Sequence, residues 1–125
     1  SRIYSKKDIS EKIIPNVIYY SMNNYEFSNK KYLLYEKFIT HLKKTHNKDV
    51  ILVLSPYHLK SYQLSLSKIP FYKDAEEKFI ELAKNNSIKI IGSYSADKTK
   101  CKNDEFYNGD HAKASCMKKI FQQIK

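Results

Sequence analysis

At 125 residues and a formal charge of +10, the chain has the length of one domain and a strongly basic balance. Its hydrophobic content of 42% and charged content of 29% are those of a folded globular chain, which excludes a disordered protein. No run of about 18 apolar residues is present, so we expect no membrane-spanning helix. The first residues also lack the apolar core of a secretion signal. Because the chain starts at Ser1 without a methionine, we expect a mature form or an excised part of a longer protein, and localisation is left open.

The positive charge comes almost entirely from scattered lysines. Of 23 basic residues only Arg2 is an arginine, although arginine is preferred for bidentate contacts to phosphates and base edges. We therefore do not expect nucleic acid as a partner, and we attribute the charge to a compositional bias toward Lys, Asn, Ile and Tyr. A basic polyanion-binding domain is kept as an alternative.

Residues 1–27 show no clear periodicity. Ile9 and Ile13 have the spacing of a short helix that Pro15 would follow, and residues 17–20 have the composition of a strand. We interpret this region as an N-terminal arm or the remnant of an upstream part.

Regular elements are predicted from Ser28 onward. A helix is expected from about Asn29 to Thr45, because apolar residues recur there at helical spacing: Leu34, Phe38, Ile39 and Leu42. The continuous apolar run Val50–Leu54 predicts a strand buried on both faces, as in a parallel sheet. Residues 55–69 are expected to be a polar loop with a possible helical turn around residues 62–66.

A second helix is expected to begin at Pro70, which suits a first helical turn, and its apolar face holds Phe71, Ala75, Phe79, Leu82 and Ala83. Asn85-Asn86 is expected to close this helix in the left-handed conformation. A second strand follows at residues 88–91 and is ended by Gly92. After a polar loop over residues 93–109, the last helix carries on one face Met117, Ile120, Phe121 and Ile124.

Strands that alternate with amphipathic helices predict an α/β fold with right-handed parallel crossovers and a sheet covered on both faces. In such sheets ligands bind beyond the carboxyl ends of the strands. Two strands make too narrow a sheet to stand alone, so we interpret residues 28–125 as a partial domain.

The candidate site is the turn over residues 106–111, which precedes the last helix. Histidine exchanges a proton near neutral pH, so His111 is the candidate general base, and Asn108 is near enough in sequence to orient its ring. Asp110 is a further candidate, although it has the alternative role of N-cap of the last helix. Tyr57 and His58 follow the first strand and are candidate substrate-binding residues; the alternative is a solvated loop.

Cys101 and Cys116 do not have zinc-motif spacing. Paired, they would pin the loop around the Asn108–His111 turn; in a reducing compartment they would stay free. A zinc site formed by Cys101, Asp110, His111 and Cys116 follows no known spacing rule, so we expect no metal and no cofactor.

The block Phe106-Tyr107-Asn108-Gly109-Asp110-His111, with the amphipathic helix after it, resembles the last block of the SGNH (GDSL) hydrolase superfamily, in which Asp-x-x-His precedes the final helix. The resemblance covers roughly residues 30–125 and implies a flavodoxin-like three-layer α/β/α sandwich, with the two predicted strands as its fourth and fifth. It implies that His111 is the base, while Asn108 stands where the family has the orienting Asp. The nucleophile block and the Gly and Asn oxyanion blocks of that family have no match here.

The resulting hypothesis is the rear half of an SGNH-hydrolase-like domain, from an esterase or acyltransferase acting on a carbohydrate or lipid acyl ester. Its nucleophile would come from upstream sequence, so this chain alone is expected to be inactive. The alternative is a non-catalytic binding or assembly module with relic active-site residues. The oligomeric state is left open.

Overall fold

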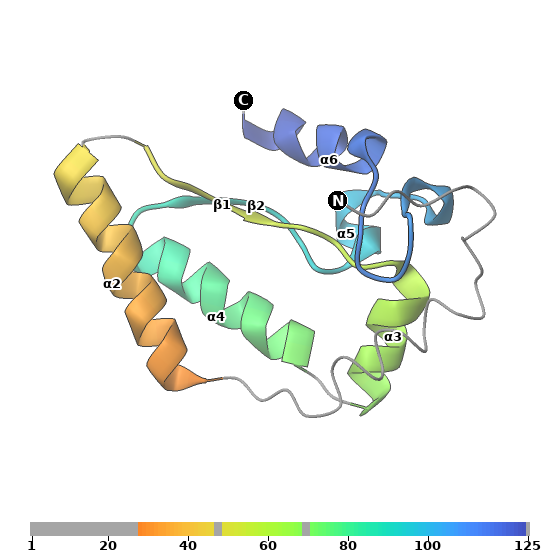
Figure 1. Cartoon of the computed structure of the whole chain (residues 1–125), viewed down its shortest axis with the longest axis horizontal. Coiled ribbons are helices and arrows are strands. Elements are labelled where there is room, and N and C mark those ends of the chain that lie inside the picture. Colours follow the sequence, from red (N-terminus) through yellow and green to blue (C-terminus); the bar gives the residue numbers. More distant parts are fainter. Residues whose placement is uncertain (1–27, 47–48, 69–70, 125) are drawn as a thin grey trace.

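A computed structural model describes residues 28–46, 49–68 and 71–124 of the chain (Figure 1). The predicted N-terminal arm over residues 1–27 lies outside the described residues. The elements in chain order are α2 (Asn29–His46), β1 (Ile51–Leu54), α3 (Leu59–Lys68), α4 (Phe71–Asn85), β2 (Lys89–Gly92), α5 (Ala96–Thr99), the 3-10 helix η2 (Asn103–Glu105), α6 (Ala114–Phe121) and the 3-10 helix η3 (Gln122–Ile124). No described helix is both long and apolar enough to cross a bilayer.

The strands β1 and β2 form a two-stranded parallel sheet within the described residues, with Leu52 opposite Ile90 and Leu54 opposite Gly92. Helices lie on both sides of it: α2 and α4 on one side, and α6 on the other (Figure 1). The predicted mixed α/β class and the parallel pairing of the two strands are therefore confirmed.

The α2–α4 side of the sheet is closed by a small apolar core. Ile39 of α2 and Leu82 of α4 are buried against Leu52 of β1, together with Ala83 and Ile88. The Ser28 hydroxyl accepts a hydrogen bond from the backbone N–H of Lys31, at 3.2 Å, which satisfies one of the free donors at the start of α2. Serine before an apolar-periodic run is thus the signal that starts this helix where the sequence predicts it.

The opposite side of the sheet carries a second core, which we call the α6-side core; its members are Ile91, Ala96, Cys101, Phe106, Cys116 and Ile120. Phe106, Cys116 and Ile120 are fully buried. This core joins α6 and Phe106, the first residue of the candidate turn, to β2, so it fixes where the turn lies.

Gly92 ends β2 in a conformation that favours glycine. Its φ is +79°, and a Cβ atom placed there would lie 2.2 Å from the carbonyl oxygen of Leu54. The predicted end of the strand at this residue therefore has a steric cause. Because Gly92 has no Cβ atom, β1 and β2 can stay paired up to Leu54 and Gly92, their last residues.

Several predictions of local structure are wrong. The segment after β1 forms the ten-residue helix α3, where only a turn was expected, and the predicted loop over residues 93–109 contains α5 and η2. At the end of α4 the left-handed residue is Ser87, with φ 52°, whereas Asn86 uses its side-chain amide to donate to the carbonyl oxygen of Leu82. A side chain that bonds back to the helix makes the left-handed conformation unnecessary at Asn86 itself.

The predicted helix faces are buried only in part. On α2, Ile39 is buried, while Leu34 and Phe38 are 58% and 57% exposed. On the last helix, Ile120 is buried, while Phe121 and Ile124 are exposed, and Cys116 takes the buried place in the first turn. Helical spacing identifies the apolar face of a helix, but it does not show whether another element covers that face.

Candidate functional site

The candidate turn is a short loop closed by backbone pairing. Phe106 and Ala112 form an antiparallel bridge, and the backbone N–H of Tyr107 donates to the carbonyl oxygen of His111 at 2.8 Å. The intervening residues 108–110 therefore reverse the chain direction. This reversal brings the side chain of His111 back over Asn108, three residues earlier.

The imidazole of His111 faces two oxygen atoms through one ring nitrogen. Its Nδ1 lies 2.8 Å from Oδ1 of Asn108 and 2.9 Å from Oδ1 of Asp110. Oδ1 of Asn108 also accepts the backbone N–H of Asp110 at 3.1 Å, which fixes the direction of its amide. A carboxylate oxygen only accepts hydrogen bonds, so these two contacts favour the tautomer with the proton on Nδ1 and the lone pair on Nε2. A histidine in this tautomer can take a proton through Nε2.

Asp110 does not cap the last helix. The residue before that helix is Lys113, and α6 begins at Ala114, four residues after Asp110. The alternative N-cap role of Asp110 is therefore wrong, because its carboxylate is turned toward the His111 ring. Side chains of adjacent residues usually diverge, and it is the tight reversal at residues 108–110 that brings these two together.

The candidate base is accessible from solvent. The side chain of His111 is 58% exposed and that of Asp110 is 35% exposed. Asn108 is half-buried between them and the backbone of the turn. A substrate could therefore approach the imidazole, and the charge of Asp110 is only partly shielded from water.

Two backbone hydrogen bonds join the turn and the loops after the two strands at the carboxyl edge of the sheet. The N–H of His58, after β1, donates to the carbonyl oxygen of Gly109 at 3.0 Å. The N–H of Tyr57 donates to the carbonyl oxygen of Tyr94, after β2, also at 3.0 Å. The three loops that the sequence places at this edge are thus joined to one another, as expected for a parallel sheet.

His58 is not on the rim where the sequence prediction placed it. Its side chain is 1% exposed, and its ring meets the ring of Phe106 edge-on with 5.5 Å between centroids. Its Nδ1 accepts the backbone N–H of Lys60 at 3.2 Å, which supports the first turn of α3. His58 therefore belongs to the framework beneath the turn, and the solvated-loop alternative is wrong for it as well.

Tyr57 lies in a cluster of tyrosines beside the turn. Its ring packs on Tyr72 of α4, with 4.0 Å between centroids, and both rings lie 5.7 Å from Tyr94. Burial raises the pKa of Tyr94 to about 12, and burial also raises the pKa of Tyr72. These phenols stay protonated at neutral pH, so they can pack or donate hydrogen bonds but do not act as bases. Tyr57 and Tyr94 remain half-buried at the edge of the cluster.

Glu76 is a residue of this edge that the sequence prediction missed. Its buried carboxylate accepts the hydroxyl of Ser93 and the backbone N–H of Tyr94, both at 2.7 Å, and pairs with Lys98 at 3.2 Å. It therefore holds the loop after β2 against α4. Its spacing in the sequence could have indicated this burial. Glu76 lies three residues before Phe79 and seven before Ala83, so it shares their apolar face of the helix.

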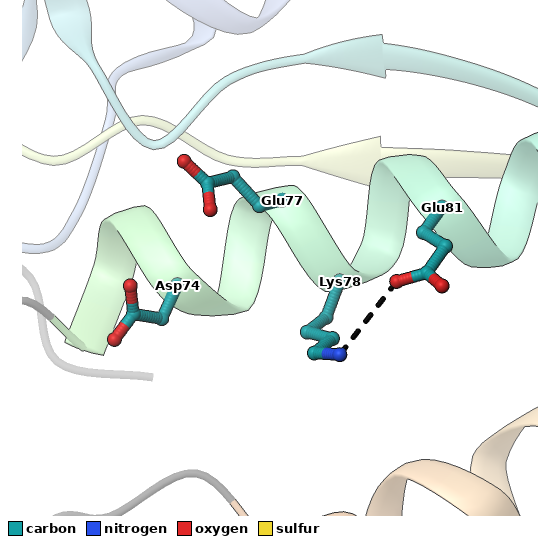
Figure 2. Close-up of a pocket in the computed structure, with 4 residues that line it drawn as sticks. All are labelled: Asp74, Glu77, Lys78 and Glu81. Atoms are coloured by element: carbon teal, nitrogen blue, oxygen red, sulfur yellow. Dashed lines mark ion pairs between the residues drawn. The ribbon is translucent and has the colours of Figure 1, made fainter.

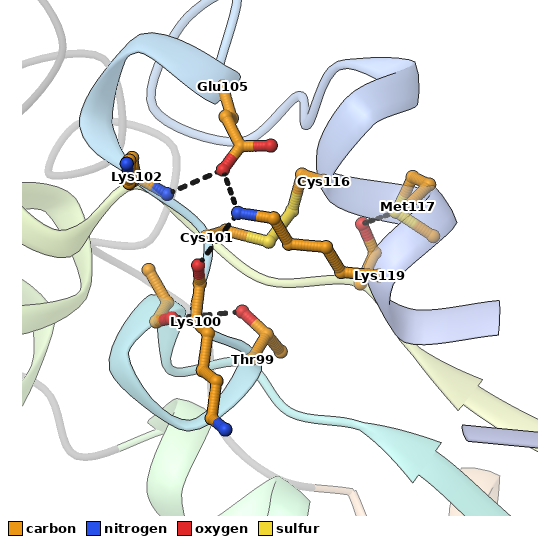
Figure 3. Close-up of a disulfide and its surroundings, with 10 residues drawn as sticks. Thr99, Lys100, Cys101, Lys102, Glu105, Cys116, Met117 and Lys119 are labelled. Carbon is orange, nitrogen blue, oxygen red and sulfur yellow. Dashed lines mark hydrogen bonds and ion pairs between the residues drawn. A yellow bond between two sulfur atoms is a disulfide. The ribbon is translucent and has the colours of Figure 1, made fainter. Parts of the chain in front are cut away.

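A disulfide links Cys101 and Cys116, which flank the candidate turn in the sequence, and Figure 3 shows it with its surroundings. Cys101 and Cys116 are bonded to each other across a separation of 15 residues, and both are buried in the α6-side core. Beside it, Glu105 accepts hydrogen bonds from the Lys119 ammonium group and from the backbone N–H of Lys102, and Lys119 also donates to the carbonyl oxygen of Lys100. The sulfur atoms are bonded to one another, so they are not available as zinc ligands. Within the described residues, no three His, Cys, Asp or Glu side chains are grouped to hold a metal ion.

A separate hollow of about 350 Å³ lies on α4 and is lined by Asp74, Glu77, Lys78 and Glu81 (Figure 2). Lys78 and Glu81 form an exposed ion pair at 3.7 Å within it. Exposed pairs of this kind contribute little. These charged, solvated side chains include no histidine, hydroxyl or thiol, so we take the turn at His111 as the candidate site.

Comparisons of the chain with models of protein families, with curated proteins and with solved structures found no match. The function of this site therefore has to be argued from its own residues.

Proposed function

We propose that this chain is the acid–base half of an SGNH-type ester hydrolase or acyltransferase, with His111 as its general base. A hydroxyl nucleophile would be supplied by residues outside those described. The proposed substrate is an acyl ester of a carbohydrate or a lipid. The proposed framework is a three-layer flavodoxin-like sandwich, of which β1, β2 and the helices on their two sides would be one part.

The observation that carries this proposal is the double contact at Nδ1 of His111, 2.8 Å from Asn108 and 2.9 Å from Asp110. General-base catalysis on a hydroxyl needs an imidazole with a defined tautomer and a lone pair directed outward. The acceptors on Nδ1 support the first condition, and the exposed position of the ring supports access to the second nitrogen. The exposed position of the ring lets a hydroxyl and an ester reach Nε2.

In the proposed reaction, Nε2 of His111 takes the proton of the nucleophilic hydroxyl as its oxygen attacks the acyl carbon. The ring then carries a positive charge, which the carboxylate of Asp110 stabilises and the Asn108 carbonyl supports as a neutral acceptor. The same ring returns the proton to the leaving alcohol when the tetrahedral intermediate collapses. Asp110 thus supplies the negative charge that Asn108 lacks.

The test is ester turnover by the longest natural polypeptide that contains this sequence, with p-nitrophenyl acetate as substrate. The His111→Ala variant is expected to lose about a hundredfold or more in kcat/KM. His41→Ala is the matched control, because His41 is an exposed histidine on α2 whose ring contacts only Thr45 among the contacts of the described residues. Equal rates for wild type and His111→Ala would overturn the proposal.

A second function is a binding or assembly module that keeps this turn without catalysis. The observation that favours it is the neutral Asn108 at the position nearest to Nδ1. In serine proteases an Asp-to-Asn change at the orienting residue costs about four orders of magnitude in kcat. Retained binding of an acylated oligosaccharide, with no turnover in wild type or in His111→Ala, would favour this function over the first.

A further inference from the structure

Asn108 is followed by Gly109, and this pair has a chemistry of its own. The backbone nitrogen of the residue after an asparagine can attack the side-chain amide carbon, and a glycine there offers no side chain to block the approach. We propose that Asn108 is a site of spontaneous deamidation, and that the aspartate formed turns the Asn108–His111 pair into a carboxylate–imidazole pair. The modification itself does not depend on the proposed function, whereas its effect on turnover does.

The geometry of the turn favours the attack. Oδ1 of Asn108 accepts the N–H of Asp110 at 3.1 Å, so the side chain is folded over the peptide unit of Gly109. The same oxygen accepts Nδ1–H of His111 at 2.8 Å. Two donors on one carbonyl oxygen withdraw electron density from the amide carbon and stabilise the negative charge that the attack develops on that oxygen. Asn108 is also only half-buried, so water can reach it.

The reaction balances with water as its only co-reactant. The Gly109 nitrogen loses its proton to water and bonds to Cγ of Asn108, and the side-chain amide nitrogen takes a proton from water and leaves as ammonia. The resulting five-membered imide is then opened by water at one of its two carbonyl groups. Opening at the backbone carbonyl gives isoaspartate, and opening at the side-chain carbonyl gives aspartate. The net change is asparagine plus water to a carboxylic acid plus ammonia.

The two products have different consequences for the site. Aspartate keeps the backbone, so a carboxylate oxygen takes the place of the amide oxygen now 2.8 Å from Nδ1. A second negative charge beside the ring favours the imidazolium that forms during base catalysis. Isoaspartate adds a methylene to the main chain, which would displace Gly109 from its contact with the N–H of His58. Only the aspartate product is expected to raise turnover.

The experiment ages the folded full-length chain at mildly alkaline pH in ¹⁸O-labelled water and maps its peptides by mass spectrometry. The peptide with Asn108 is expected to show the mass change from amide to acid, with the new carboxyl oxygen present as ¹⁸O. Asn103, which precedes Asp104, and Asn86, which precedes Ser87, are controls within the same chain and are expected to convert more slowly. Asn108→Gln keeps the amide and lengthens the side chain, so it is expected to stay unconverted. Conversion of Asn108 no faster than that of Asn103 would overturn the proposal.

The effect on the site is tested separately with Asn108→Asp in the longest natural polypeptide. Turnover of p-nitrophenyl acetate is expected to rise by about tenfold or more, against a loss of up to four orders of magnitude for the reverse change in serine proteases. An unchanged rate in an enzyme that needs His111 would overturn the activating role of the modification. Absence of turnover in wild type, in Asn108→Asp and in His111→Ala would instead count against the proposed function, and the mass result would still decide whether Asn108 deamidates.

Discussion

The α6-side core and the outer face of α2 are both apolar in sequence, yet they differ completely in the structure. In the α6-side core Phe106, Cys116 and Ile120 are fully buried around a disulfide. The outer face of α2, made of Leu33, Leu34 and Phe38, is 56% to 58% exposed. Helical spacing marked α2 and α6 in the same way, so periodicity alone does not tell a covered face from an uncovered one.

The difference matters for function because the candidate turn belongs to the buried side. Phe106 begins the turn and Cys101 and Cys116 enclose it, so the position of His111 depends on the α6-side core. Beside the outer face of α2, Tyr35 packs on Phe79 of α4 with 5.5 Å between ring centroids. Changes in the first region should therefore affect stability far more than similar changes in the second.

The largest expected effect is that of Phe106→Ala. Removal of a fully buried phenylalanine costs about 3–5 kcal/mol of unfolding free energy. Phe38→Ala is the matched control, because the same side chain is removed from a site that is 57% exposed, and we expect less than about 1 kcal/mol there. Urea unfolding of both variants measures the contrast. Equal losses would contradict the distinction between the two regions.

The second-largest loss of unfolding free energy is expected when the disulfide is removed. Cross-linking over 15 residues stabilises by about 3 kcal/mol through its effect on the unfolded chain. The Cys101→Ser, Cys116→Ser double variant should therefore unfold at lower urea, and a reducing agent should destabilise the wild type but leave the double variant unchanged. A wild type that is insensitive to reduction when unfolding is followed to equilibrium would show that the bond does not support this core.

A smaller effect is expected from Glu105. Hydrogen bonds from Lys119 and from the backbone of Lys102 lower the pKa of its carboxyl group from 4.5 to about 2. Because the folded state holds the charged form more strongly, this stabilisation is present above pH 4.5 and is lost as the pH falls toward 2. Glu105→Gln should cost about 1.5 kcal/mol at neutral pH, as for a hydrogen bond to a charged group. The gap between variant and wild type should close in acid; a gap that stays constant with pH would contradict the assignment.

The smallest effect is expected on the outer face of α2. Leu34 is 58% exposed, so Leu34→Lys should change the unfolding free energy by no more than about 0.5 kcal/mol. Urea unfolding of this variant beside Ile39→Ala, a buried neighbour on the same helix, gives the comparison directly. A loss at Leu34 as large as that at Ile39 would mean that this face is covered in solution.

Much of the regular structure could be predicted from the sequence because it follows from local pattern. The helix expected from Asn29 to Thr45 is α2, which ends at His46, and the run at residues 50–54 contains β1. The second strand was expected at residues 88–91 and lies at Lys89–Gly92. Two of these boundaries have a cause in one residue: Ser28 at the start of α2 and Gly92 at the end of β2.

The parts that could not be predicted depend on tertiary contacts. Helix α3 lacks a long apolar period, and the N–H of its residue Lys60 is satisfied by the buried ring of His58. The contact of Asn108 with His111 follows from a three-residue spacing across a turn, and the structure has that contact. The contact of Asp110 with the same ring nitrogen depends on how tightly residues 108–110 reverse the chain, and spacing does not encode this.

The most direct test of the account is the tautomer of His111, read from the nitrogen shifts of its imidazole by NMR at neutral pH. Oxygen acceptors from both Asn108 and Asp110 at Nδ1 predict a proton on Nδ1 and a lone pair on Nε2. The Asn108→Ala, Asp110→Ala double variant should return the ring to a mixture of tautomers. A wild-type ring with its proton on Nε2 would contradict the account. Its lone pair would then be on Nδ1, so Nε2 could not take a proton from a hydroxyl at the exposed side of the ring.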